Sequence, residues 1–411
     1  MFRSPLTKFH AGSLLRNHHR LTATNALPFL SIQQQQKRTF SSALKSNANK
    51  PLAPIPLNQL SKVLHERYDL GPELPLAIQR KLAEYEQRHD IKILYCVETG
   101  SRCYGYYNES SSDFDIRFIY ISKLTDYLKL KNNLATSYRS TKTERIPETI
   151  QNIYEVKSDT VRSVDIMGWE MRKALTSIRS GNTTILEWLA SNMVLTWQSD
   201  SIQRLRDIAA KVLHKSPYTV AYRQYSTAKI NFLEVKREEM KALKQAKEDP
   251  NINLERVGLD VKKALFIIQT LLQINVLEWK YLINTSESNV QQPLDEVLIL
   301  EFQTLFNKVR NLRTIEIERE IEELYQIRIN TPYMPMSTIH FGSRVEAWIM
   351  YELERAQMVC NQLRNKFSQD KQNIDKQIAE ELDDSFLRIL METDTNFIYR
   401  IEPPKVKKNN K

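Results

Sequence analysis

Residues 98–122 read ETGSRCYGYYNESSSDFDIRFIYIS and contain the pattern from which the fold is worked out. The second half is rich in β-branched and aromatic residues and predicts a buried strand. Asp113 and Asp115 stand at the entry to this strand, although strands disfavour aspartate. Gly100 and Gly105 lie close together in a chain that has only 8 glycines. The stretch therefore combines bare backbone, a hydroxyl and two carboxylates, and this combination needs a chemical explanation.

Phosphoryl transfer from a nucleoside triphosphate requires these groups. Side chains at positions i and i+2 of a strand point to the same face, so Asp113 and Asp115 are expected to share a metal site while Phe114 turns into the core. Magnesium prefers hard oxygen ligands, and two such ions stabilise the attacking and leaving oxygens. Gly100 and Ser101, at a strand-to-helix turn, offer backbone N–H groups and a hydroxyl to phosphate oxygens.

The order of these motifs resembles a known family. Gly100-Ser101, eleven further residues and then Asp113-Phe114-Asp115 resemble the signature of the DNA polymerase β-like nucleotidyltransferase superfamily. The longer wording GSRCYGYYNESSSDFDIRFIY is similar to its RNA-repair-pathway branch, as are VDIMGWEMRKAL at 164–175 and GNTTILEWL at 181–189. The resemblance covers residues 91–191 well and residues 220–350 loosely. It implies an α+β fold, with a polymerase-β-like core of a small mixed sheet flanked by helices, followed by an α-helical domain.

The resemblance also implies roles for individual residues. Asp113 and Asp115 would bind two Mg²⁺ ions, with Mn²⁺ as the alternative metal, and Gly100 and Ser101 would hold the β- and γ-phosphates. A third carboxylate is expected from a neighbouring strand. Two acids flanked by apolar residues fit this position, Asp165 and Glu155. Asp165 is favoured because it leads directly into a helix that carries a lysine, which is the order that the resemblance implies.

Four basic residues are weaker candidates for nucleotide contacts. Arg102 and Arg117 carry the fork of donors that suits phosphate, although Arg117 alternates outward from its strand and could equally pair with an acid. Lys173 either reaches the triphosphate or belongs to a solvated helix face. Lys263 matches a lysine that the resemblance implies, but Gln269-Thr270 stands where an Arg-Pro pair is expected.

The beginning of the chain has a composition of its own. The first 65 residues contain no acidic residue and nine Lys or Arg residues, which is typical of a mitochondrial presequence. The expected cleavage lies shortly after Arg38, and the expected location is the mitochondrial matrix; a disordered basic tail is the alternative. Without residues 1–40 the formal net charge falls from +10 to +4, too balanced to indicate a dedicated nucleic-acid binder.

The expected organisation has five parts, with ranges 1–45 (presequence), 46–73 (linker), 74–200 (nucleotidyltransferase core), 201–395 (α-helical domain) and 396–411 (basic polar tail). Within the core, strands are expected at 91–98, 112–122 and 163–169, and helices at 74–89 and 169–182. No run approaches the ~20 consecutive apolar residues that a membrane span requires.

The predicted function is a metal-dependent nucleotidyltransferase, an enzyme of RNA repair that transfers a nucleoside monophosphate such as that of ATP to an acceptor hydroxyl and releases pyrophosphate. RNA is the acceptor that the resemblance favours, while a protein or small-molecule acceptor would use the same core. The alternative from another class is a catalytically inactive nucleotidyltransferase fold that serves as a mitochondrial RNA-binding or assembly module. The sequence does not indicate the nucleotide base, the number of nucleotides added or the oligomeric state.

Overall fold

The structure is a computed structural model that describes residues 56–60, 62–64, 73–108, 111–128, 149–156, 162–197, 201–248, 257–284, 290–368 and 371–393. All of them lie in one unit that begins at Pro54. The predicted presequence, most of the predicted linker and the predicted basic tail fall outside the described residues.

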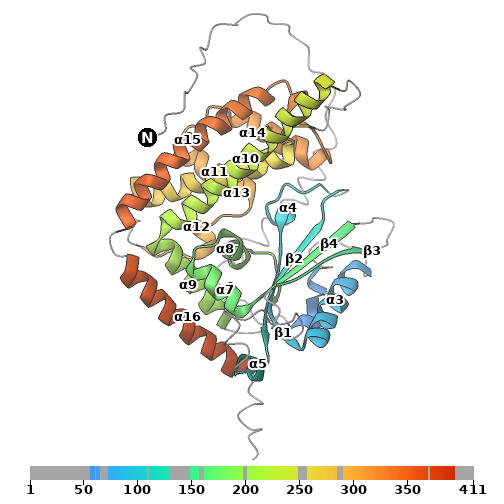
Figure 1. Ribbon diagram of the computed structural model, residues 1–411, viewed down its shortest axis with the longest axis vertical. Helices are drawn as coiled ribbons and strands as arrows, with labels where there is room; N and C mark the ends of the chain where they lie inside the picture. The colour runs from blue at the N-terminus through green and yellow to red at the C-terminus, as the bar shows by residue number, and fades with distance from the viewer. Residues whose placement is uncertain are drawn as a thin grey trace, which may run out of the picture. The chain divides into compact units, whose positions relative to one another are not determined.

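A five-stranded mixed sheet contains all the strands of the described part of the chain (Figure 1). Its strand order is β3-β4-β2-β1-β5, and β2 and β4 run parallel while the other neighbours are antiparallel. The strands are β1 (Ile91–Thr99), β2 (Phe114–Ser122), β3 (Thr149–Val156), β4 (Arg162–Glu170) and β5 (Val194–Trp197). The strands that carry VDI and FDIR, β4 and β2, are therefore neighbours in the interior of the sheet.

The alternation of side chains along β2 gives the sheet two different faces. Phe114, Ile116 and Phe118 are fully buried and join a core cluster with α3 (Glu73–His89) and the short 3₁₀-helix η1 (Leu57–Gln59). The residues between them are Asp115 and Arg117 at the start of the strand, followed by buried Ile119 and Ile121, which join the larger cluster formed with the other helices. Because the side-chain period of a strand is two, Asp115 and Arg117 face the helical side of the sheet.

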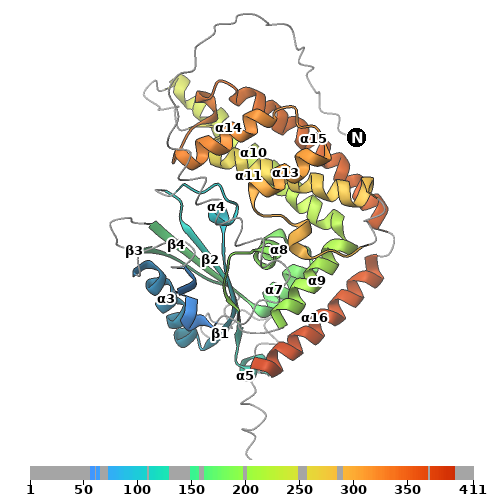
Figure 2. The same cartoon turned by 180° about the vertical axis from the view of Figure 1, so that it is seen from behind.

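Helices cover that second face and continue beyond it, as the two opposite views show (Figures 1 and 2). Those within the first half are α4 (Gly100–Cys103), α5 (Leu124–Leu128), α7 (Met171–Arg179) and α8 (Thr183–Ala190). The later ones are α9 (Ser201–Lys215), α10 (Pro217–Glu248), α11 (Val261–Glu278), the π-helix η2 (Trp279–Ile283), α12 (Leu294–Val297), α13 (Phe302–Leu312), α14 (Glu318–Asn330), the 3₁₀-helix η3 (Met336–Thr338), α15 (Gly342–Phe367) and α16 (Lys371–Thr393). In both views α4 lies at the end of the sheet that is nearest to α10, α11 and α14.

The α+β fold with a small mixed sheet and a helical second half is confirmed. The strands predicted around residues 91–98, 112–122 and 163–169 are present, and the structure adds β5 and the edge strand β3. Because one apolar cluster runs from the sheet into the later helices, the domain boundary at 200/201 stays a prediction. Among the described residues, no helix combines the length and the apolarity that crossing a membrane would take.

Candidate functional site

Two carboxylates meet on the helical face of the sheet because of strand register. Asp115 of β2 lies directly beside Asp165 of β4 in the parallel ladder. Neighbouring strands are about 4.8 Å apart, and residues in register point to the same face. Both side chains are partly accessible, with 27% of Asp115 and 25% of Asp165 exposed. The sheet itself therefore brings together two of the three predicted metal ligands.

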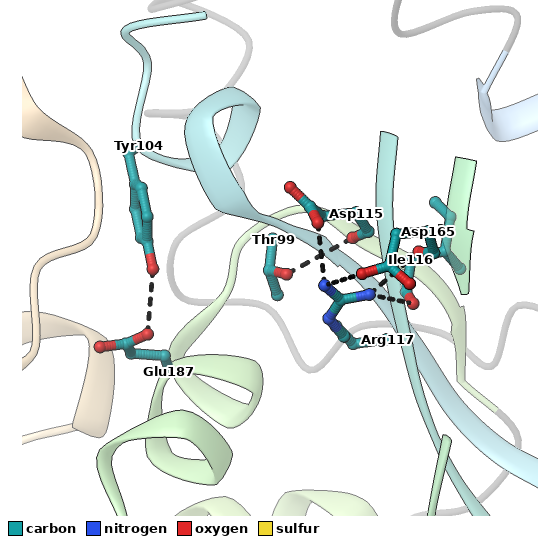
Figure 3. A network of polar contacts seen from close by, with 7 residues as sticks. All are labelled: Thr99, Tyr104, Asp115, Ile116, Arg117, Asp165 and Glu187. Atoms are coloured by element: carbon teal, nitrogen blue, oxygen red, sulfur yellow. Dashed lines mark hydrogen bonds and ion pairs between the residues drawn. The ribbon is translucent and has the colours of Figure 1, made fainter. Parts of the chain in front are cut away.

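A guanidinium lies between these two carboxylates (Figure 3). Nη2 of Arg117 is 2.8 Å from Oδ1 of Asp115 and 2.9 Å from Oδ2 of Asp165. Its Nη1 donates to the backbone carbonyl of Asp165 at 2.9 Å. Of the two partners expected for Arg117, phosphate or an acid, the structure shows acids, and both belong to the predicted site.

Gly100 allows the carboxylate of Asp115 to approach the backbone of α4. Gly100 has φ +69°, a conformation that side chains rarely adopt, and an added Cβ would collide with the Asp115 carboxylate. Thr99 pairs with Asp115 across β1 and β2, and its hydroxyl lies 3.4 Å from the Asp115 carbonyl. Ser101 follows on α4 and is buried. The bare backbone in the motif thus places the turn of Gly100 and Ser101 directly against Asp115, while a phosphate contact by Ser101 stays a prediction.

Asp113 stands outside the strand. The sequence pattern predicts Asp113 and Asp115 on one face of a strand, but β2 begins at Phe114 and Asp113 is exposed in front of it. The pKa of Asp115 is raised, mainly because burial disfavours the charged form, and the charges of Asp165 and Asp113 add to this rise. Asp113 is therefore close enough to act on Asp115 through its charge.

The donor set fits a divalent cation in part. The carboxylates of Asp115 and Asp165 already converge on one positively charged atom, the Nη2 of Arg117, and carboxylate oxygens are the ligands that Mg²⁺ prefers. Within the described part of the chain, Oδ1 of Asp165 is buried and accepts no hydrogen bond. No three His, Cys, Asp or Glu side chains of the described residues are grouped closely enough to hold a metal. Two carboxylates are thus in place, and a third would have to approach them.

The other candidate for the third carboxylate lies farther from Asp115. Glu155 is on the edge strand β3, where its backbone pairs with Ser163, and Ile153 is the residue opposite Asp165. Strand β4 separates β3 from β2. The register therefore places the backbone of Asp165, and not that of Glu155, next to Asp115.

The two predicted basic contacts, Arg102 and Lys173, lie against aromatic rings. Arg102 is buried, with its guanidinium 4.0 Å from the centre of the Phe114 ring and its Nη2 donating to the carbonyl of Ser112 at 3.3 Å. Lys173 lies over Trp169, 4.7 Å from the ring centre, and Trp169 is four residues farther along β4 than Asp165. Their contacts with a nucleotide stay predictions.

Lys262 is a candidate that the sequence reasoning missed. It is exposed on the first turn of α11, and its charge lowers the pKa of Asp115. The sequence reasoning selected its neighbour Lys263, whose backbone N–H is capped by Asp260 at 2.8 Å. Lysines in the first turn of a helix are disfavoured by the helix dipole, so the adjacent pair Lys262-Lys263 is the feature of the sequence that could have drawn attention to this turn.

Tyr104 and Glu187 form a second polar contact, separate from the carboxylate pair (Figure 3). Tyr104 is the residue that follows α4, and its hydroxyl donates to Oε2 of Glu187 on α8 at 3.0 Å. In Figure 3, Thr99 lies between this contact and Asp115. Burial raises the pKa of Glu187 to about 7, while hydrogen bonds from Tyr104 and Gln224 oppose the rise. These residues line a cavity of about 20 Å³ together with Gln269 of α11. Asn182 caps the start of the same helix, α8, because its side-chain oxygen accepts a hydrogen bond from the Thr184 N–H.

Comparison with known proteins identifies the family of the chain. Residues 75–380 match the model of the family described as RlaP, the RNA repair pathway DNA polymerase beta family. The chain is also similar to the uncharacterized protein YcgL of Bacillus subtilis (strain 168), with 24% identity over 249 residues, which is 60% of this chain and 80% of that protein. The family match covers well over half of the chain and includes β1, β2, β4 and the helices up to α15. It confirms the resemblance found in the motifs, and the chain belongs to the RNA repair pathway DNA polymerase beta family.

Proposed function

We propose that the protein is a divalent-metal-dependent nucleotidyltransferase that transfers a nucleoside monophosphate from a nucleoside triphosphate to a hydroxyl group of RNA and releases pyrophosphate. Family membership supports the general activity and the link to RNA repair. The observation that carries the proposal is the convergence of Asp115 and Asp165 on a single cationic nitrogen. Parallel register makes this convergence a property of the sheet itself.

The residues have the following roles in this proposal. Asp115 and Asp165 would hold the cation, and exposed Asp113 would complete a site for two ions from the loop in front of β2. When bound, Mg²⁺ or Mn²⁺ supplies the positive charge that polarises the phosphate and lowers the pKa of the acceptor hydroxyl. Gly100 keeps the backbone open where the triphosphate approaches Asp115, and Lys262 provides a compensating charge from α11.

In this mechanism Arg117 competes with the cation for the two carboxylates. Its Nη2 contacts one oxygen of each acid, so a cation drawn to the pair either weakens these contacts or uses the other oxygens. The charge of Arg117 stabilises the two acids while no cation is bound, because two carboxylates about 5 Å apart repel each other. Displaced from them, the guanidinium becomes available to phosphate oxygens, for which its fork of donors is suited.

The same contact bears on the second candidate function, a catalytically inactive fold. Such a fold would normally have lost a metal carboxylate, but here an ion pair with Arg117 gives Asp115 and Asp165 a role without metal. In that case the protein would be an RNA-binding or assembly module. The two candidates differ in one measurable property, since only an enzyme incorporates nucleotide.

The proposed location is the mitochondrial matrix, on the basis of the acid-free, basic first 65 residues. A fusion of residues 1–50 to a fluorescent reporter should enter mitochondria and be shortened near residue 40. A full-length reporter spread through the cytosol would contradict this location.

The experiment that tests the function is transfer of labelled nucleotide. Full-length protein is incubated with mitochondrial RNA, Mg²⁺ and each nucleoside triphosphate labelled at the α-phosphorus. Incorporation that is lost on ribonuclease treatment and absent in Asp115→Asn supports the proposal. Asp383→Asn, a change of an exposed aspartate on α16, is the matched control and should stay active. Label that resists ribonuclease but not protease would identify a protein acceptor, and no incorporation with any nucleotide would favour the inactive module.

A further inference from the structure

The segment between α4 and β2 is held by the helical second half of the chain. This segment, whose residues 104–108 and 111–113 are described, connects the Gly100–Ser101 turn to Asp113 and so decides where Asp113 stands. At its beginning, the N–H of Phe302 donates to the Tyr104 carbonyl at 2.9 Å. The hydroxyl of Tyr325 donates to the carbonyl of the next residue, Gly105, also at 2.9 Å. Helices α13 and α14 thus fix the start of the segment.

The end of the segment is held at Ser112, the residue before Asp113. Nη2 of Arg328, on α14, donates to the Ser112 hydroxyl at 3.1 Å, and the same oxygen accepts from the Asn108 N–H at 2.9 Å. The side-chain amide of Asn108 donates in turn to the Ile329 carbonyl at 3.1 Å. Ser112 is 1% exposed, so these contacts are shielded from water.

Arg328 makes contacts that a smaller or apolar residue could not make. It is 3% exposed, and its Nη1 donates to the carbonyls of Pro332 at 2.8 Å and Thr331 at 3.4 Å, so one planar group joins the end of α14 to Ser112. Burial of a guanidinium among neutral oxygens is unfavourable compared with an apolar side chain of the same size. The position therefore favours arginine for its geometry, and not for stability alone.

Arg328 also faces the beginning of α11. Burial lowers the pKa of Arg328, and the charge of Asp260, which caps that helix, opposes this lowering. Lys262, which acts on Asp115, is two residues beyond Asp260. The guanidinium that holds Ser112 is thus also acted on by the charge of the residue that caps α11.

We propose that Arg328 is a positioning residue, which holds Ser112, and through it Asp113, in the place needed beside Asp115. The assignment rests on the proposed function in one respect, that Asp113 takes part in binding the nucleotide and its metal. The hydrogen bonds that join Arg328 and Ile329 of α14 to Ser112 and Asn108 of the segment, called the latch below, do not depend on that function. The test therefore separates the two ideas.

Hydrogen exchange of the full-length protein tests the latch. The Ser112 N–H is bonded to the Asn108 carbonyl at 2.9 Å, so its exchange rate reports whether the segment is held. Arg328→Met should increase exchange over residues 111–113 by about tenfold, as expected for the loss of one net hydrogen bond. Arg328→Lys should give a smaller increase. Arg310→Met removes an exposed arginine of α13 that pairs with Glu318 and Glu322, and it should leave this segment unchanged.

A double-mutant cycle tests the positioning role. Ser112→Ala removes the oxygen through which Arg328 acts, so Arg328→Met should cause little further loss of nucleotide transfer in the Ser112→Ala background. The loss should appear mainly as a lower kcat and a higher Mg²⁺ requirement, and Arg328→Lys should recover part of it. Unchanged exchange at residues 111–113, or fully additive losses in the cycle, would overturn the proposal. If Arg328→Met does not fold, Ser112→Ala and Arg328→Lys carry the same two readouts.

The two ideas can fail separately. If exchange responds as expected while wild-type protein transfers no nucleotide, the latch stands and the proposed function is wrong. If wild-type protein is active but neither Ser112→Ala nor Arg328→Lys changes exchange or kcat, the function stands and the positioning role is wrong.

Discussion

Asp115 and Asp165 stand side by side in the parallel register of β2 and β4, and their carboxylates reach the same nitrogen atom of Arg117 at 2.8 and 2.9 Å. Register alone would leave two like charges about 5 Å apart on a partly buried face. The guanidinium two residues farther along β2 offsets that repulsion. Charge balance at this pair therefore connects the stability of the metal-free protein to its affinity for a cation.

Removal of Arg117 should make stability depend on metal. Arg117→Met leaves Asp115 and Asp165 without their shared partner, so we expect the free energy of unfolding without metal to fall by about 1–3 kcal/mol. Added Mg²⁺ should restore more of this loss than it adds to the wild type, because it takes over the neutralising role. The measurement is the melting temperature with and without Mg²⁺.

Arg310→Met serves as the control for Arg117→Met, since Arg310 also bridges two acids but on an exposed surface. Its melting temperature should change little and should not depend on Mg²⁺ more than that of the wild type. An equal response to Mg²⁺ in Arg117→Met and wild type would place the metal elsewhere.

A side chain at Gly100 should displace Asp115. Gly100→Ala combines an unfavourable positive φ with a collision against the Asp115 carboxylate, whereas Gly258→Ala has a positive φ and only ordinary van der Waals contact with Glu239. We expect Gly258→Ala to lose about 1 kcal/mol and Gly100→Ala to lose clearly more. Chemical denaturation measures both. In an Asp115→Gly background, the additional loss of stability caused by Gly100→Ala over that of Gly258→Ala should disappear. If the additional loss persists, the collision is not with Asp115.

Glu187 should make stability fall with rising pH. Its pKa is raised from 4.5 to about 7 in the folded protein, so the folded state retains a proton that the unfolded state loses first. The stabilisation is complete below about 4.5 and is lost as pH rises through about 7, by at most on the order of 3 kcal/mol. The side chain at position 187 of the Glu187→Gln variant cannot lose a proton. The unfolding free energy of the wild type should therefore fall relative to that of Glu187→Gln as the pH rises from about 4.5 to about 7. A constant difference from pH 4 to pH 8 would contradict the shifted pKa.

Lys262 should contribute to nucleotide affinity. Its charge acts on Asp115 across the site, so Lys262→Met is expected to raise the KM for the nucleoside triphosphate roughly tenfold, with a smaller effect on kcat. The neighbouring change Lys263→Met is the matched control and should leave KM within about threefold. A larger effect of Lys263→Met would reverse the assignment of the two lysines.

The strands and the central motif were predictable because their signals are local. Alternation from Phe114 to Ser122 and the pattern Val164-Asp165-Ile166 are visible in the sequence, and the fold class was implied by the family resemblance of the motifs that contain them. Strand β5 (Val194–Trp197) was missed because four residues are too few for a period to show. Asp113 was placed on the strand because sequence patterns locate the ends of elements poorly.

The remaining features depend on contacts between distant segments. Arg102 carries the same type of side chain as Arg117, but the buried Glu98 and the carbonyl of Ser112 draw it into the protein. Arg328 meets Ser112 across 216 positions of sequence, and no local pattern marks such a pair. The third carboxylate and the nucleotide contacts of Ser101, Arg102 and Lys173 stay predictions.

The most direct test of the account compares the rate of nucleotide transfer by Asp165→Ala and Glu155→Ala. Asp165 adjoins Asp115 in the ladder, whereas the backbone of Glu155 pairs with Ser163 one strand farther away. We predict that Asp165→Ala lowers kcat by about 1,000-fold or more with a melting temperature close to that of the wild type, and that Glu155→Ala stays within about tenfold. The reverse ranking would move the third ligand to Glu155. Undiminished transfer in both variants would contradict the metal-dependent mechanism itself.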